Sequence, residues 1–228
     1  CRRWRATFFV LASLASLTWA FAGVLNPAMS QLHAFVSEYS ARDQPWRYLF
    51  QTTDVIMGTL LCLAGLATLV WARHRPLGRQ GWSGVGFVAG GFFSVLDALV
   101  TMDCSPTRSQ ACMAAEEAGH VSVNHVVHVG TSTIVVVGFA LPILLLNSTM
   151  TRFRGFGLVV TWAWVVFTLL NGIGAVGWFV GTPMDYTGIW QRFSLGLGTL
   201  WWLILAADDI VTARVQDRAL LLSSLTRS

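Results

Sequence analysis

Residues 94–132 read SVLDALVTMDCSPTRSQACMAAEEAGHVSVNHVVHVGTS, and no other stretch of the chain carries as many chemically active side chains. The stretch holds several acids, two cysteines and three histidines, and a long apolar segment lies on each side of it. This arrangement is typical of two membrane-spanning helices that are joined by a polar loop. We therefore expect a membrane protein that presents this loop at one surface of the bilayer.

The composition extends this expectation to the whole chain of 228 residues. Hydrophobic residues make up 54% and charged residues 11%, with a mean hydropathy of +0.60, whereas soluble domains carry about 25% charged residues. A segment in lipid must satisfy its own backbone hydrogen bonds, which favours helices, and the strand-like alternation of a β-barrel is absent. The sequence thus predicts an all-α, polytopic membrane bundle in a single domain, 1–228. Its six transmembrane helices are expected at about 6–26, 50–72, 82–101, 123–147, 155–180 and 188–207.

All 15 basic residues are arginine, and their distribution predicts the topology. If the N-terminus lies in the cytoplasm, eleven of the 15 arginines are cytoplasmic and four are on the outer side: Arg42, Arg47, Arg108 and Arg192. Membrane proteins carry such an excess in their cytoplasmic loops. We therefore expect a multi-pass plasma-membrane protein with both termini in the cytoplasm. The net charge of +4 then indicates contact with membrane lipids, and nucleic acid is not an expected partner.

The first apolar segment has two interpretations. The motif Ala20-Phe21-Ala22 resembles a signal-peptidase site, which would make this segment a cleaved signal peptide. The apolar run is roughly twenty residues long, however, whereas the apolar region of a signal peptide spans about 7–15 residues. The length favours a retained first helix, and cleavage would leave five helices in the same orientation.

Two segments on the predicted outer side have recognisable features. The apolar residues of 30–40 follow a helical period, which suits a short segment lying in the outer membrane interface. The loop 102–121 carries Cys104 and Cys112, which are separated by seven residues that include turn-forming Ser105 and Pro106. Because this side of the membrane is oxidising, we expect a disulfide that closes the loop.

Ionisable residues of the predicted helices gather at one depth. Asp54, Asp97 and Arg192 lie near the outer ends of the second, third and sixth helices. His125 and His128 stand three positions apart in the first turns of the fourth helix, and therefore on one face. A charged group at the centre of a membrane helix costs about 2.5–3.5 kcal/mol, so such groups mark functional sites by default. The predicted pocket is the set Asp54, Asp97, Ser122, His125, His128 and Arg192.

This pocket is compatible with several functions. We favour a polar pocket in the outer leaflet that binds a lipid headgroup, a small ligand or a proton. One alternative is a metal-dependent hydrolase of a lipid amide or ester. A second alternative is a transporter or channel subunit. The plainest alternative is a structural or gating role, in which the histidines hydrogen-bond Asp97 or Asp54. The sequence indicates no reaction, no catalytic residue and no oligomeric state.

The hydrolase alternative requires a set of metal ligands. Zn²⁺ or a similar ion would be held by His125, His128, Asp97 and Asp103, and it would lower the pKa of a bound water. The spacing of the two histidines is a weak pattern by itself. Metal binding is therefore the less favoured hypothesis for these residues.

Several motifs together form a familiar pattern: Ser37-Glu38-Tyr39, 45–50 (PWRYLF), Asp54, Asp97, 102–106 (MDCSP) with Cys112, Ser122-x-x-His125-x-x-His128, and Gln191-Arg192. This pattern resembles the bacterial six-helix membrane protein family catalogued as Domain of Unknown Function nine-nine-eight, especially its actinobacterial members. The resemblance covers nearly the whole chain. It implies a polytopic protein of the bacterial plasma membrane and brings no established activity.

A more distant analogy concerns chemistry. The alkaline ceramidase and adiponectin-receptor superfamily builds a zinc amidase from three histidines, an Asp and a Ser in a seven-helix bundle. Here Asp97, Ser122, His125 and His128 are similar groups. The helix number and the histidine spacing differ from that superfamily, so the analogy implies a comparable set of groups and no common descent.

Overall fold

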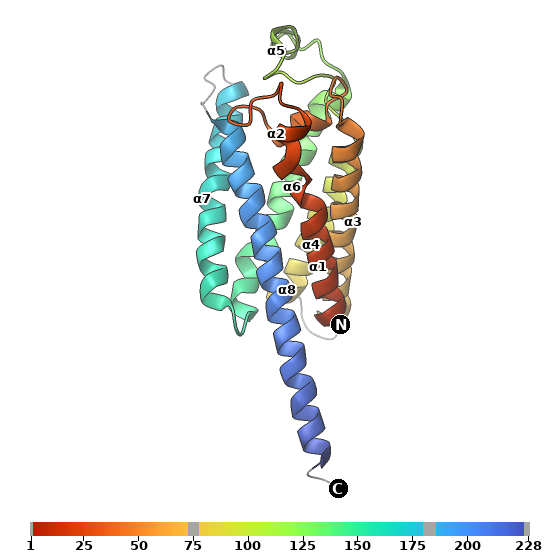
Figure 1. Ribbon diagram of the computed structural model, residues 1–228, viewed down its shortest axis with the longest axis vertical. Helices are drawn as coiled ribbons and strands as arrows, with labels where there is room; N and C mark the ends of the chain where they lie inside the picture. The colour runs from red at the N-terminus through yellow and green to blue at the C-terminus, as the bar shows by residue number, and fades with distance from the viewer. Residues whose placement is uncertain (1, 73–77, 180–185, 226–228) are drawn as a thin grey trace.

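The computed structural model describes residues 2–72, 78–179 and 186–225. Within these residues the chain is all-helical, and six helices are long and apolar enough to cross a membrane (Figure 1). This confirms the predicted all-α bundle of six membrane-spanning helices. The helices are α1 (Arg2–Ser16, continued by η1 Leu17–Phe21 and α2 Ala22–Leu25), α3 (Arg47–Ala72), α4 (Arg79–Leu99), α6 (Val123–Leu146, followed by η3 Asn147–Thr149), α7 (Arg154–Phe179) and α8 (Thr187–Leu225).

The last helix is longer than its sequence predicts. The sixth helix was expected to end near residue 207, where two aspartates follow, but α8 continues to Leu225 and projects beyond the bundle (Figure 1). Asp208 and Asp209 are 2% and 0% exposed, and their carboxylates are satisfied by the loop before α7 and by arginines of α1, respectively. The helix therefore continues through them, and neither Gly nor Pro interrupts the chain from there to Leu225.

The two longest connecting segments, 26–46 and 100–122, gather at one end of the bundle, which we call the cap end, and α1 begins and α8 ends away from it (Figure 1). We call the opposite end the terminal end. The cap end contains the short helices η2 (Val36–Ser40) and α5 (Gln110–Glu117). Only η2 is helical within 30–40, so the helical period there marks a single 3-10 segment. The sulfur atoms of Cys104 and Cys112 lie 1.99 Å apart, at the disulfide distance that the sequence predicted.

The lateral order of the helices differs from their order in the chain. The contacts run from α6 to α4, α3, α1, α8 and α7, so α1 packs between α3 and α8. Aromatic side chains fill the interior, including a contact between Phe9 and Phe87 with ring centroids 4.9 Å apart. Phe139 of α6 also meets Trp202 of α8, with ring centroids 5.4 Å apart. This order decides which polar residues can meet at the cap end.

Glycines allow α3 and α4 to approach closely. A Cβ added to Gly91 would lie 2.4 Å from the carbonyl oxygen of Gly58, and one added to Gly65 would lie 2.7 Å from the backbone nitrogen of Val88. Both contacts are with backbone atoms, which cannot rotate away. In a membrane, such close backbone approach is a main source of helix association.

We expect Gly91→Ala to lower the free energy of unfolding by about 1–3 kcal/mol, because overpacking forces the two backbones apart. Gly172→Ala on α7 is the matched control, since a Cβ there meets nothing within 4 Å. Thermal unfolding of the purified protein in detergent measures both variants. Equal stability of the two would contradict the close contact of α3 and α4.

Candidate functional site

Asp97 joins α4 to α6 near the cap end. Its carboxylate accepts hydrogen bonds from the hydroxyl groups of Thr131 and Ser132, the latter at 2.9 and 3.1 Å. The Nδ1 of His128 lies 3.2 Å from the same carboxylate. All three partners stand on one face of α6, so the predicted face of that helix does meet Asp97.

The surroundings of His128 decide where its proton lies. Its Nδ1 is 3.2 Å from the carbonyl oxygen of Asp97 and 3.0 Å from that of Val100. Every neighbour of Nδ1 is thus an acceptor, and we assign the ring proton to this nitrogen. The Nε2 atom is then an acceptor when the ring is neutral, and it is buried without a partner among the described residues.

Asp103 and Ser122 form a second cluster, where the disulfide loop enters α6. Asp103 accepts hydrogen bonds from the backbone and the hydroxyl group of Ser122, at 2.6 and 2.8 Å. Ser122 is also the N-cap of α6. Burial alone would raise the pKa of Asp103, but the two Ser122 hydrogen bonds and the charge of Arg42, 3.3 Å away, outweigh it and lower the pKa.

His125 belongs to this second cluster and has the opposite tautomer from His128. Its Nδ1 accepts a hydrogen bond of 3.2 Å from the backbone of Asp103, so we assign the proton to Nε2. That nitrogen lies 3.8 Å from the carboxylate of Glu116. The ring is 1% exposed and ties the loop to the helix.

Asp54 of α3 lies near Asp97 of α4. Among the described residues none donates a hydrogen bond to the Asp54 carboxylate. The structure thus brings Asp54, Asp97 and His128 into one neighbourhood. Ser122 and His125 lie in the adjacent cluster.

Arg192 is the one pocket candidate that lies elsewhere. Its Nη1 donates to the carbonyl oxygens of Ala34 and Gly188, both at 2.9 Å, and its Nη2 is 3.3 Å from the hydroxyl oxygen of Tyr39. The α8 helix that carries it packs mainly against α1 and α7, whereas α4 packs mainly against α3 and α6. The six predicted pocket residues therefore occupy the same end of the bundle in separate clusters.

The proposed metal ligands do not assemble into a metal site. Within the described part of the chain, no group of three or more His, Cys, Asp or Glu side chains is placed to hold an ion. The side chains are also engaged otherwise, because Asp103 binds Ser122 and the Nδ1 of His125 accepts from the backbone. These residues do not fit the Zn²⁺ site of the hydrolase alternative.

Glu38 belongs to the motif Ser37-Glu38-Tyr39 but was not among the predicted pocket residues. It is 0% exposed and accepts hydrogen bonds from the backbone of Phe35 and from Ser105 and Thr107. Burial raises the pKa of its carboxyl group, although these hydrogen bonds oppose the shift. The available signals were this motif and the presence of an acid in a short interfacial segment.

A groove of about 370 Å³ lies between η1 and α8 and was not predicted from the sequence. Five of its seven lining residues are apolar, and the other two, Arg192 and Trp19, carry polar side-chain atoms. The full lining is Trp19, Ile189, Arg192, Phe193, Gly196, Leu197 and Leu200. Phe193 and Leu200 are also exposed, so the groove is part of the outer surface of the bundle. It can accept an elongated apolar molecule that carries a polar group at one end.

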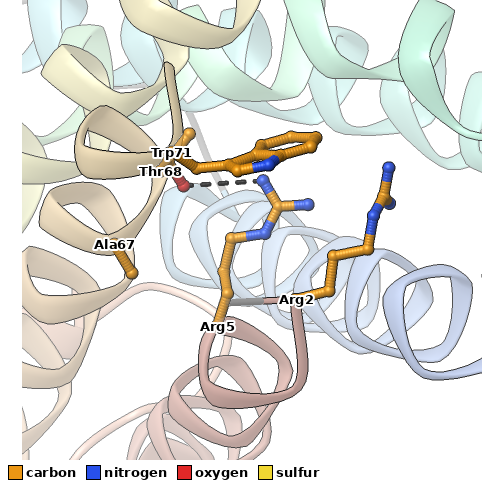
Figure 2. A pocket seen from close by; sticks show the side chains of 5 residues that line it. All are labelled: Arg2, Arg5, Ala67, Thr68 and Trp71. Carbon is orange, nitrogen blue, oxygen red and sulfur yellow. Dashed lines mark hydrogen bonds between the residues drawn. The ribbon is translucent and has the colours of Figure 1, made fainter. Parts of the chain in front are cut away.

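Arginines of α1 form a further polar site at the terminal end. Arg2 and Arg5 line a small hollow with Ala67, Thr68 and Trp71, and Figure 2 shows both guanidinium groups beside the indole. Both arginines also bind Asp209.

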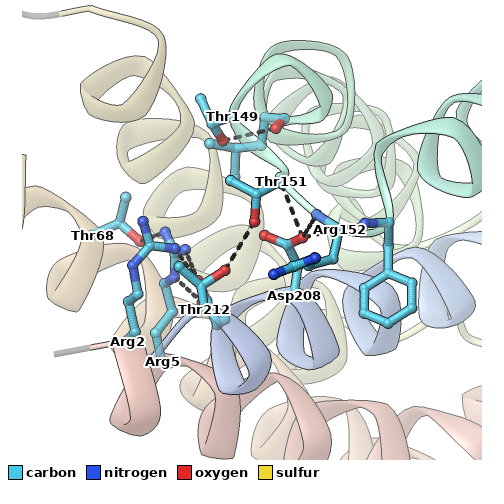
Figure 3. Close-up of polar contacts among 11 residues, drawn as sticks. Arg2, Arg5, Thr68, Thr149, Thr151, Arg152, Asp208 and Thr212 are labelled. Carbon is cyan, nitrogen blue, oxygen red and sulfur yellow. Dashed lines mark hydrogen bonds and ion pairs between the residues drawn. The ribbon is translucent and has the colours of Figure 1, made fainter. Parts of the chain in front are cut away.

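The neighbouring Asp208 accepts hydrogen bonds from the backbone of Thr151, Arg152 and Phe153 ahead of α7 (Figure 3). The carboxylates of Asp208 and Asp209 are both satisfied within the protein, so this polar site at the terminal end has a structural role.

Of three comparisons with known proteins, one finds a match. No curated protein and no solved structure matches it. A family model described as "Protein of unknown function (DUF998)" matches residues 9–208, which is most of the chain and includes every pocket candidate. The chain is therefore a membrane protein that belongs to the DUF998 family, whose activity is unassigned.

Proposed function

We propose that this protein binds a membrane lipid in the groove between η1 and α8, in the outer leaflet of a bacterial plasma membrane. The observation that carries the proposal is the combination of apolar walls with the buried guanidinium of Arg192 at one end. From Arg192 to Leu200 the groove follows α8 for about 12 Å, at 1.5 Å per residue. Its volume lies within the range of about 300–1,000 Å³ that small-molecule sites span.

The orientation of this lipid follows from the position of Arg192. This residue is near the cap-end start of α8, where a headgroup would lie, and Leu200 is deeper in the apolar part. A lipid whose chain lies along Phe193 and Leu197 would bring its polar part to Arg192. The hydrogen-bond clusters of Asp97 and Asp103 then have a structural role, in which they connect α4, α6 and the disulfide loop.

Two observations support an outward-facing cap end. Among the described arginines, most lie at the terminal end, as expected for cytoplasmic residues. Cys104 and Cys112 are at disulfide distance at the cap end, and a disulfide persists in the oxidising space outside the cytoplasm. Both termini would then be cytoplasmic.

Filling the groove tests the proposal. Gly196 lies in the groove, and a Cβ there would be 3.5 Å from the ring of Trp19, which is an ordinary contact. Gly196→Leu should therefore fold while its longer side chain occupies the lipid space. We expect the amount of lipid retained by the purified protein in native mass spectrometry to fall roughly tenfold, as for a loss of about 1.4 kcal/mol in binding.

Gly172→Leu on α7 is the matched control, because a Cβ there meets nothing within 4 Å. Its retained lipid should equal that of the unaltered protein. If Gly196→Leu retains as much lipid as Gly172→Leu, the groove is not the lipid site.

A further inference from the structure

The charge of Arg192 is buried without an acidic partner among the described residues. The side chain is 9% exposed, and its three hydrogen bonds go to two backbone carbonyl groups and a phenol, all of which are neutral. No described carboxylate lies within the ion-pair distance of 4.0 Å, and Glu38 acts on it only through space. A buried charge of this kind is costly unless a counter-charge reaches it.

Two buried hydrogen-bond donors of the groove also lack partners. These are the Nε of Arg192 and the indole Nε1 of Trp19, for which the described residues provide no acceptor. Both residues line the groove, one from α8 and one from η1. Buried donors are nearly always satisfied in proteins, and both of these are covered from solvent, so a ligand oxygen would reach either one after its side chain turns toward the groove.

The lining also contains no carboxylate that would pair with a cation. No Asp or Glu is among the residues that line the groove, and its remaining walls are apolar. A headgroup ammonium would meet the positive charge of Arg192 and no acid. A binding site can discriminate between lipids by repelling one headgroup as well as by attracting another.

We propose that the groove selects lipids whose headgroup carries a net negative charge on a phosphate, in preference to zwitterionic lipids with the same chains. This inference rests on the proposed lipid-binding function and specifies its ligand class. Arg192 is then the phosphate ligand, and Trp19 donates its indole N–H to a phosphate or ester oxygen of the same lipid. Hydrogen bonds to charged oxygens of this kind are stronger than neutral ones.

The experiment compares two lipids that differ only in the headgroup. Purified protein is delipidated and titrated with dioleoyl phosphatidylglycerol or dioleoyl phosphatidylcholine in detergent, and bound lipid is counted by native mass spectrometry. We expect the anionic lipid to bind roughly tenfold tighter or more, as a hydrogen-bonded charge contributes. Inorganic phosphate alone, without chains, should not compete at millimolar concentration.

Trp19→Phe is the sharpest variant, because it removes an unpartnered N–H and keeps an aromatic ring. Its unfolding temperature without lipid should stay close to that of the unaltered protein, while its affinity for the anionic lipid falls several-fold. Trp162→Phe is the control, since that tryptophan is 63% exposed on α7, away from the groove. Arg192→Gln should abolish the preference between the two lipids.

The outcomes separate this inference from the proposed function. Equal binding of both lipids that Gly196→Leu still abolishes would overturn the headgroup selectivity and leave lipid binding in place. Binding of neither lipid, or binding that Gly196→Leu does not change, would overturn lipid binding in the groove itself. Competition by inorganic phosphate would show a site for the free anion and would overturn the lipid as its occupant.

Discussion

Asp209→Ala is expected to lower the free energy of unfolding by about 3–5 kcal/mol, which is the usual effect of leaving a buried charge without its partner. Arg5 binds this carboxylate with two hydrogen bonds of 2.6 Å, and the two residues are 5% and 0% exposed. Arg2 adds a third contact at 3.1 Å. The substitution leaves the guanidinium of Arg5 in the joint of α1 and α8 without a counter-charge, and thermal unfolding in detergent measures the loss.

Asp217→Ala is the matched control for this prediction. Asp217 pairs with Arg3 between the same two helices, but the side chains are 53% and 69% exposed, so its removal should change stability by no more than about 1 kcal/mol. The double variant Arg5→Met and Asp209→Leu should recover much of the loss, because an apolar pair replaces both charges. If Asp209→Ala lowers the free energy of unfolding no more than Asp217→Ala does, the pair of Arg5 and Asp209 does not stabilise the contact between α1 and α8.

Glu38→Ala should lower the free energy of unfolding of the cap end by about 3 kcal/mol. The substitution leaves the backbone N–H groups of Phe35 and Thr107 without their acceptor, and each such buried donor costs about 1–3 kcal/mol. Relief from burying the carboxylate offsets part of this cost. Limited proteolysis of the loop 102–121 reports the release of the cap directly. Glu117→Ala in the exposed part of α5 should leave the proteolysis rate unchanged.

The same carboxyl group makes the stability of the cap end depend on pH. Because the pKa of Glu38 in the folded protein is raised above its ordinary value of 4.5, the native state holds this proton more tightly than the unfolded chain does. Its contribution to stability is full below about pH 4.5 and is lost as the pH rises through the raised pKa. Asp103 acts in the opposite direction, since its lowered pKa contributes stability above its ordinary value of 3.8.

Comparison of the unaltered protein with Glu38→Gln isolates the first effect, because Asp103 is the same in both. The stability difference should favour the unaltered protein more at pH 4.5 than at pH 7.5. A difference that grows with rising pH would mean that the buried carboxylate is stabilised in its charged form.

The sequence by itself determined the six helices and the depth of their ionisable residues. Each apolar run must form its own backbone hydrogen bonds in lipid, so the existence of a membrane helix is a local property of about twenty residues. The spacing of His125 and His128 likewise puts both on one face of α6, and the structure finds both buried, with His128 against Asp97. The cysteine pair was also predictable, because the two residues are close in the chain.

Only the tertiary structure decided which of these residues meet. Asp97 and Arg192 have a similar depth, but α4 packs mainly against α3 and α6 while α8 packs mainly against α1 and α7, and Arg192 binds Ala34 and Tyr39. The same packing buries Glu38 and opens the groove between Trp19 and α8, and neither the burial of Glu38 nor the groove follows from the sequence of a single segment. Hydropathy sets how deep a residue lies in the membrane. Its lateral neighbours depend on helix order and rotation, which are set by close contacts such as that of Gly58 with Gly91 and cannot be seen within one segment.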